Sequence, residues 1–131
     1  MSDSVLDEMT QKVLGFRDER NWAQFHSLKN LAAGLSIEAG ELQELFLWKS
    51  DTEAEAYVNS AEGKTRLGEE MADVLVYLLL LADHAKIDLK AASDRKIELN
   101  AKKYPVEKFP LDLIMMEYLQ LRKFLIVRQN Y

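Results

Sequence analysis

The sequence predicts an all-α protein: a four-helix bundle, extended by one more helix at its C-terminus, that assembles into oligomers. Only two prolines and five glycines occur in 131 residues, and the abundant Leu, Ala, Glu and Lys favour helices. Apolar residues recur at helical spacing along several segments. One segment becomes apolar on nearly every side from Val74 onward, which is typical of a helix that is buried all round. Because a bundle this small does not cover every face of such a helix, we expect a second subunit to do so.

Residues 4–20 are the first expected helix, because Ser4 followed three residues later by Asp7 resembles an N-terminal cap. Residues 21–26 then break the helical pattern and carry two large aromatic side chains, Trp22 and Phe25. Such side chains either fill a core or wall a pocket, and the residues alone favour the core. The buried stripe of the helix itself comprises Val5, Leu6, Met9, Val13 and Phe16.

The second expected helix, residues 27–49, places two glutamates on or beside its apolar face. On a helical wheel, Glu38 lies within about 60° of four leucines, and Glu41 lies at the edge of the same stripe. Glu44 borders that face, and Trp48 ends the helix one turn later. The leucines around Glu38 are Leu31, Leu35, Leu42 and Leu45.

A polar, acidic stretch at residues 50–63 follows, and we expect it to be a connection with a short helix over 53–59. Residues 65–86 form the third main helix, which repeats the pattern of paired carboxylates. Glu70 and Asp73 are three residues apart, so they are neighbours on one helix face. The apolar residues of that face include Leu67, Val74, Tyr77 and Leu81.

The fourth main helix, residues 89–102, carries a basic face and ends at Tyr104 and Pro105. Taken alone, a basic face of this kind is interpreted as solvated. Pro110 suits the first position of a last helix, residues 111–128, whose apolar stripe packs either on the domain or on another subunit. The basic residues of the fourth helix are Arg95, Lys96, Lys102 and Lys103.

Packing the two carboxylate helices together would bring four acidic side chains into a largely apolar interior. Carboxylates in such a place are costly unless they are protonated or coordinate a cation. Oxygen ligands favour hard cations, so we expect Mg²⁺, with Mn²⁺ as a substitute. Magnesium held in this way is typically completed by water and substrate phosphate, and a glutamate not fully used as a ligand accepts the proton of an attacking water. The sequence therefore favours hydrolysis of a phosphate ester or phosphoanhydride.

Several other classes of protein are excluded or disfavoured. A ferritin-like di-iron site needs Glu-x-x-His pairs, but the residue three before His84 is Leu81. The absence of cysteine excludes disulfides, Cys-ligated zinc and cysteine nucleophiles. A net charge of −5 disfavours nucleic-acid binding, and the longest apolar run, residues 74–82, is too short for a membrane span. No secretory signal is visible, so we expect a cytoplasmic protein without nucleic-acid or membrane partners.

The chain also carries a series of sequence blocks in a fixed order. The central pattern is Glu-x-x-Glu followed by Glu-x-x-Asp, as Glu38-Ala-Gly-Glu41 and Glu70-Met-Ala-Asp73. The other blocks are residues 20–26 (RNWAQFH), 29–31 (KNL), 41–48 (ELQELFLW), 73–78 (DVLVYL), and a closing Lys96, Asn100, Lys103, Tyr104 and Pro105. Over about residues 4–105 the chain resembles the MazG-like nucleoside triphosphate pyrophosphohydrolases, an all-α superfamily, and within it the small dCTP pyrophosphatase group.

The resemblance implies Mg²⁺-dependent hydrolysis of a (deoxy)nucleoside triphosphate between the α and β phosphates, which yields the monophosphate and pyrophosphate. It implies that Glu38, Glu41, Glu70 and Asp73 hold the metal, with Glu38 and Glu41 as catalytic residues. The substrate-binding residues that it implies are Trp22, Phe25 and Trp48 around the base with Tyr77 beside them, Asn30 and Glu44 near the nucleotide, and Lys96, Asn100, Lys103 and Tyr104 at the phosphates or ribose. It further implies a homodimer or homotetramer, with residues 1–105 as the family domain and 106–131 as a C-terminal helical extension.

The sequence departs from the family pattern at two places, and two alternative functions stay open. Val13 stands where some relatives of the dCTP group have a histidine, which leaves the base preference open. The segment after Pro105 is not matched by the family core. The main functional alternative is a non-catalytic nucleotide- or metal-binding module that regulates a partner, and the other is a purely structural helical oligomer.

Overall fold

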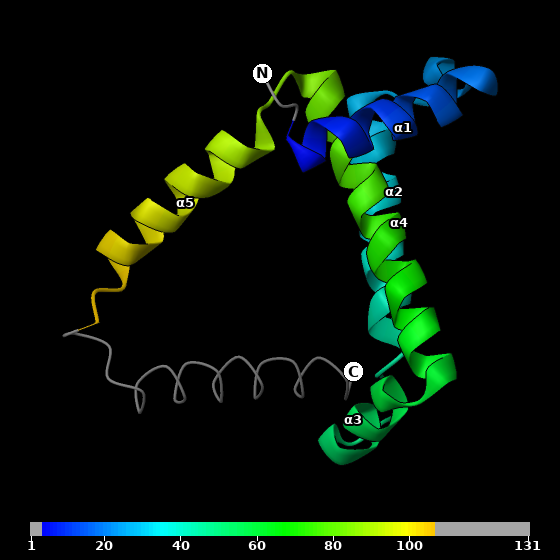
Figure 1. The fold of residues 1–131 in the computed structure, drawn as a ribbon, viewed down its shortest axis with the longest axis vertical. Helices are drawn as coiled ribbons and strands as arrows, with labels where there is room; N and C mark the ends of the chain where they lie inside the picture. The colour runs from blue at the N-terminus through cyan, green and yellow to red at the C-terminus, as the bar shows by residue number, and fades with distance from the viewer. Residues whose placement is uncertain (1–3, 107–131) are drawn as a thin grey trace. The chain divides into compact units, whose positions relative to one another are not determined.

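The computed structural model describes residues 4–106 of the chain, and every regular element in that range is helical (Figure 1). The all-α fold class is therefore confirmed, whereas the last expected helix, residues 111–128, lies outside the described residues. The elements in order are α1 (Val5–Glu19), the 3₁₀ helix η1 (Trp22–Phe25), α2 (Leu28–Glu44), α3 (Asp51–Asn59), α4 (Ala61–Ala85) and α5 (Leu89–Lys103).

Serine caps begin each of the first four α-helices. The side-chain oxygen of a serine accepts a hydrogen bond from a backbone N–H in the first turn, which satisfies a group that has no partner within the helix. At α1 and α3 the third residue returns the bond through its carboxylate, so both helices begin with a capping box. The serines and the residues whose backbone N–H donates to them are Ser4 with Asp7 (3.2 Å), Ser27 with Asn30 (3.1 Å), Ser50 with Glu53 (3.2 Å) and Ser60 with Gly63 (3.0 Å).

The predicted break at residues 21–26 is confirmed. Asn21 adopts the left-handed conformation, with φ 54° and ψ 31°, which ends the path of α1 and starts η1. Asparagine visits this region more readily than most residues. The Nδ2 of Asn30, in the first turn of α2, donates a hydrogen bond to the carbonyl of Phe25 at 2.9 Å. The aromatic connector is thereby tied to the start of α2.

Two element boundaries differ from the sequence expectation. α2 ends at Glu44 rather than near residue 49, because residues 45–48 form tight turns held by hydrogen bonds between residues three apart. α4 begins at Ala61 rather than at Thr65, because the cap is Ser60. The short helix expected over 53–59 is present as α3 and starts two residues earlier.

Residues 1–89 form one compact unit built around α2 and α4. α4 lies along α2 and also contacts α1 and α3 (Figure 1). The two long helices are antiparallel, because Gly34 in the first half of α2 faces Tyr77 near the end of α4, whereas Glu41 lies beside Glu70. Within the described range, the buried hydrophobic side chains are Leu31, Leu79, Leu80 and Ala82.

Within residues 4–106, the apolar part of α4 is only partly covered. Leu79 and Leu80 are buried, but residues 74–78 all keep partial exposure. The sequence analysis predicts that a second subunit covers this area. That subunit stays a prediction.

Residues 90–131 form the second compact unit, in which α5 is the described helix. Within α5 no residue is buried. The domain boundary predicted at residue 105 stays a prediction. None of the helices in residues 4–106 combines the length and the hydropathy that a membrane crossing needs.

Candidate active site

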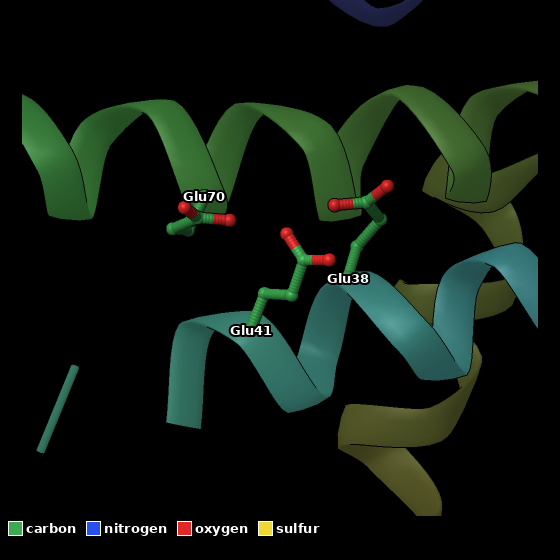
Figure 2. Close-up of side chains that lie close together, drawn as sticks. All are labelled: Glu38, Glu41 and Glu70. Carbon is green, nitrogen blue, oxygen red and sulfur yellow. The ribbon is translucent and has the colours of Figure 1, made fainter. Parts of the chain in front are cut away.

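Three glutamates from two helices converge in the first unit. Glu38 and Glu41 of α2 and Glu70 of α4 each offer a carboxylate oxygen, and these oxygens lie within 4.8 Å of one another (Figure 2). Glu38 and Glu70 are partly buried, whereas Glu41 is exposed. Because α2 and α4 are antiparallel, the Glu-x-x-Glu and Glu-x-x-Asp pairs face each other across the helix interface. We call Glu38, Glu41 and Glu70 the acidic cluster.

The fourth predicted ligand, Asp73, is exposed and is not among these three. Its charge nevertheless acts on the cluster. Burial raises the pKa of Glu38 above its usual value, and the negative charges of Glu41, Asp73 and Glu70 raise it further. The role of Asp73 as a metal ligand therefore stays a prediction.

One carboxylate oxygen of Glu70 is buried without a hydrogen-bond partner among the described residues. This oxygen is Oε2, and the Glu70 side chain is only 13% exposed. Its Oε1 lies 3.9 Å from Nη2 of Arg66, one turn earlier on α4, which is too long for a hydrogen bond. A buried carboxylate oxygen without a partner is costly. The donor set and this unpaired oxygen therefore fit a hard divalent cation such as Mg²⁺ or Mn²⁺.

The three predicted base-pocket aromatics are exposed, so the core role that the residue types alone favoured for Trp22 and Phe25 is wrong. Trp22 is 45% exposed, Phe25 61% and Trp48 90%. Trp22 and Phe25 lie in η1, and Trp48 closes the turns that follow α2. Large aromatic faces left open to solvent are available to stack on a planar ligand.

A small cluster next to Trp22 fixes the orientation of its ring. Phe16, near the end of α1, meets Trp22 edge-on, with ring centroids 5.7 Å apart and planes at 75°. The guanidinium carbon of Arg20 lies 3.6 Å from the Phe16 centroid and 6.0 Å from that of Trp22. Nη1 of Arg20 also donates to the carbonyl of Phe16 at 2.9 Å. Trp22 thus contacts Phe16, and Arg20 lies close to both rings.

The other predicted substrate contacts are placed as follows. Asn30 uses its amide to hold the Phe25 carbonyl, which gives it a structural role at the base of the connector. Tyr77 lies with its ring against Gly34, inside the α2–α4 interface. Glu44 is exposed at the end of α2.

The predicted phosphate-binding residues belong to the second unit, where Lys96, Asn100 and Lys103 lie on α5 and Tyr104 follows it. All four are exposed. Nζ of Lys103 lies 5.0 Å from the ring centroid of Tyr104. Their role toward the acidic cluster stays a prediction.

Sequence reasoning missed three residues near the site. Gly34 gave no signal because its importance comes from a side chain on another helix. Arg66 was detectable as a basic residue four before Glu70, the spacing of an ion pair on a helix. Arg20 was detectable as a cation two residues before Trp22.

Comparisons with known proteins agree with this geometry. The model of the MazG-like family matches residues 34–110, which include all three glutamates of the acidic cluster. The chain is 40% identical over 104 residues to dCTP pyrophosphatase 1 of Mus musculus, and 39% identical over 103 residues to dCTP pyrophosphatase 1 of Homo sapiens. Each match covers 79% of this chain and 61% of the relative, so the chain spans less than two thirds of those proteins.

A solved structure supports the same assignment. The crystal structure of a pyrophosphatase from Archaeoglobus fulgidus is similar, with a TM-score of 0.74 and 40% identity. The similarity covers 80% of this chain and 96% of that one. The resemblance expected from the sequence blocks is thereby confirmed, and the chain belongs to the MazG-like family.

Proposed function

We propose that the protein hydrolyses (deoxy)nucleoside triphosphates between the α and β phosphates, releasing the monophosphate and pyrophosphate. The observation that carries this proposal is the meeting of Glu38, Glu41 and Glu70 within 4.8 Å, with Oε2 of Glu70 buried and unpaired. The names of the relatives, dCTP pyrophosphatase 1 and a pyrophosphatase, support the reaction class. We further propose dCTP-like substrates and a role in clearing the dNTP pool.

In this proposal the cation is Mg²⁺, for which Mn²⁺ can substitute, held by Glu38, Glu41, Glu70 and Asp73. A cation at this position supplies positive charge to the phosphates and makes water more acidic. Glu38 is the first candidate to accept a proton from the attacking water, which requires that its carboxylate is not fully used as a ligand. The exposed carboxylate of Glu41 is the second candidate for this step.

The remaining residues bind and orient the substrate. Trp22, Phe25 and Trp48 offer faces on which any base stacks, so they supply affinity with little selectivity. Lys96 and Lys103 supply positive charge for the phosphates. Asn100 and Tyr104 contribute hydrogen-bonding groups to the same end of the nucleotide.

The test is incubation of the chain with Mg²⁺ and a panel of nucleoside triphosphates, with the products identified by phosphorus NMR. We expect pyrophosphate and the monophosphate in equal amounts. Release of orthophosphate would refute the proposed bond. Nucleotide binding without turnover under Mg²⁺ and Mn²⁺ would instead support a regulatory binding module.

We also propose that the protein is a homodimer or homotetramer. The support is the partial exposure of the apolar residues 74–78 of α4, together with exposed large side chains elsewhere on the unit. These include Phe16 (51% exposed), Ile37 (60%) and Met71 (55%). The cytoplasmic location expected from the sequence stays a prediction.

A further inference from the structure

At Gly34, α2 and α4 approach each other closely because a side chain is missing. A Cβ atom placed on Gly34 would overlap three atoms of the Tyr77 ring, namely Cδ1, Cε1 and Cζ. The ring therefore lies directly on the backbone of α2, in space that any other residue at position 34 would occupy. Gly40 of the same helix differs, because a Cβ there would meet nothing within 4 Å.

This contact is the next layer of the interface beyond the carboxylates. Gly34 precedes Glu38 by four residues, and Tyr77 follows Asp73 by four residues. Residues four apart lie on one helix face, about 6 Å along the axis. The contact is thus one turn from Glu38 on α2 and about two turns from Glu70 on α4.

The physical link between the two layers is the stiffness of the packed helices. Protein interiors are close-packed, so a side chain forced into a full layer is accommodated by movement of its neighbours. A shift of α2 away from α4 at Gly34 extends to the residues one turn later. Mg²⁺ needs oxygen ligands at about 2.0–2.1 Å in nearly octahedral geometry, so even a small separation of the helices weakens its binding.

We propose that Gly34 and Tyr77 form a spacer that sets the separation of α2 and α4 at the acidic cluster and thereby its affinity for a divalent cation. Both are positioning residues, since they act through Glu38, Glu41 and Glu70. The inference rests on the proposed function, because it assumes that these carboxylates hold the cation.

The experiment is a titration of the full chain with Mn²⁺ in the absence of nucleotide. Binding is measured from the decrease of the EPR signal of free Mn²⁺. Gly34→Ala is expected to weaken Mn²⁺ binding by about 10- to 100-fold, the range for substitutions that leave metal ligands in place but disturb their support. Gly40→Ala is the matched control on the same helix and is expected to bind like the wild type. Both variants are checked for wild-type helical circular dichroism.

A second pair of variants separates spacing from general damage. Tyr77→Leu removes the ring from the interface without adding a clash, and it is also expected to weaken Mn²⁺ binding. The double variant Gly34→Ala/Tyr77→Leu gives the new methyl group the space that the ring has left. We expect it to recover part of the affinity lost in Gly34→Ala. If Gly34→Ala does not fold, Tyr77→Leu and the double variant still decide the matter.

The outcomes distinguish this inference from the proposed function. Unchanged Mn²⁺ affinity in Gly34→Ala, or in Tyr77→Leu, would overturn the spacer alone. Equal loss in Gly40→Ala would also overturn it, because that variant adds a methyl group without touching Tyr77. Absence of Mn²⁺ binding by the wild-type chain would overturn both proposals.

Discussion

Asp73 is the residue whose role the structure sharpens most. It is exposed and stands outside the group of three glutamates, yet its charge helps to raise the pKa of Glu38. We expect the Asp73 side chain to turn toward the acidic cluster when a cation binds there. The i, i+3 spacing predicted that Asp73 and Glu70 share a face, but it could not show how far each side chain reaches across to α2.

We therefore predict that Asp73→Asn weakens Mn²⁺ binding and lowers pyrophosphate release by about 10- to 100-fold, the range for groups that support a metal site. The helical circular dichroism signal should stay at the wild-type level, because Asp73 is exposed. Titration with Mn²⁺ and a steady-state assay measure the two effects. Full activity in Asp73→Asn would remove Asp73 from the set of ligands.

His26 gives a second prediction at this scale. Its Nδ1 is buried without a hydrogen-bond partner among the described residues. Burial lowers the pKa of His26 below its ordinary value of 6.5, and the positive charges of Arg17 and His84 lower it further. The folded protein thus holds this imidazole neutral at pH values where the unfolded chain already binds a proton.

The contribution of His26 to the free energy of unfolding is therefore fully present above pH 6.5, the ordinary pKa of histidine in the unfolded chain. This contribution is lost as the pH falls toward the lower pKa of His26 in the folded protein. We expect the midpoint of urea unfolding to fall between pH 7.5 and 5.5 in the wild type, and His26→Gln to flatten this dependence. His84→Gln is the control and should keep most of the slope, since burial is the larger cause. An identical slope in His26→Gln and the wild type would contradict this account.

At the scale of elements, serine caps begin the first four α-helices, and the starts of α1 and α2 could be read from the sequence. The start of α4 could not, because residues 61–66 are polar and carry no apolar periodicity. Only the contact of Ser60 with Gly63 and Tyr57 reveals it: Oγ of Ser60 accepts from Gly63 N at 3.0 Å and donates to the Tyr57 carbonyl at 2.6 Å. The end of α2 was also missed, because local propensity does not distinguish an α-helix from the tight turns of residues 45–48.

Two glycines of α4, Gly63 and Gly68, have different surroundings, so we predict opposite effects on stability when each is replaced by alanine. A Cβ at Gly63 would overlap the carbonyl of Tyr57, whereas one at Gly68 of the same helix would meet nothing within 4 Å. Gly68→Ala should stabilise the protein by about 0.5–1 kcal/mol through helix propensity. Gly63→Ala should destabilise it by about 1–3 kcal/mol, the usual cost of overpacking. Urea unfolding measures both, and equal gains would show that the junction is not tight.

The acidic cluster combines a feature visible in the sequence with one that is not. The paired carboxylates follow from the i, i+3 spacing of Glu38 with Glu41 and of Glu70 with Asp73. The distance between the pairs depends on the packing of α2 against α4, and there Gly34 and Tyr77 are in contact. The sequence around Gly34 carries no local signal that this residue faces the ring of Tyr77, which lies forty-three residues later in the chain.

At the scale of the whole molecule, the described residues leave apolar surface exposed along α4 and around Phe16, Ile37 and Met71. Burial of such surface contributes about 25 cal/mol per Å² to association. We predict a solution mass of two or four times 15.1 kDa in sedimentation equilibrium at micromolar concentration. A mass of 15.1 kDa under these conditions would exclude the proposed assembly.

The central claim is that carboxylates from α2 and α4 form one cation site that drives pyrophosphate release. The most direct test is the rate of pyrophosphate release as a function of Mg²⁺ concentration, measured for the wild type, Glu70→Gln and Glu69→Gln with the best nucleotide of the panel. Glu69 is the matched control, because it is an exposed glutamate next to Glu70 but outside the acidic cluster. We predict that Glu70→Gln lowers the rate of pyrophosphate release by more than about 100-fold, because mutation of groups that only support metal ligands already lowers activity by about 10- to 100-fold. Glu69→Gln should keep the wild-type rate. Equal rates for Glu70→Gln and Glu69→Gln would contradict the claim.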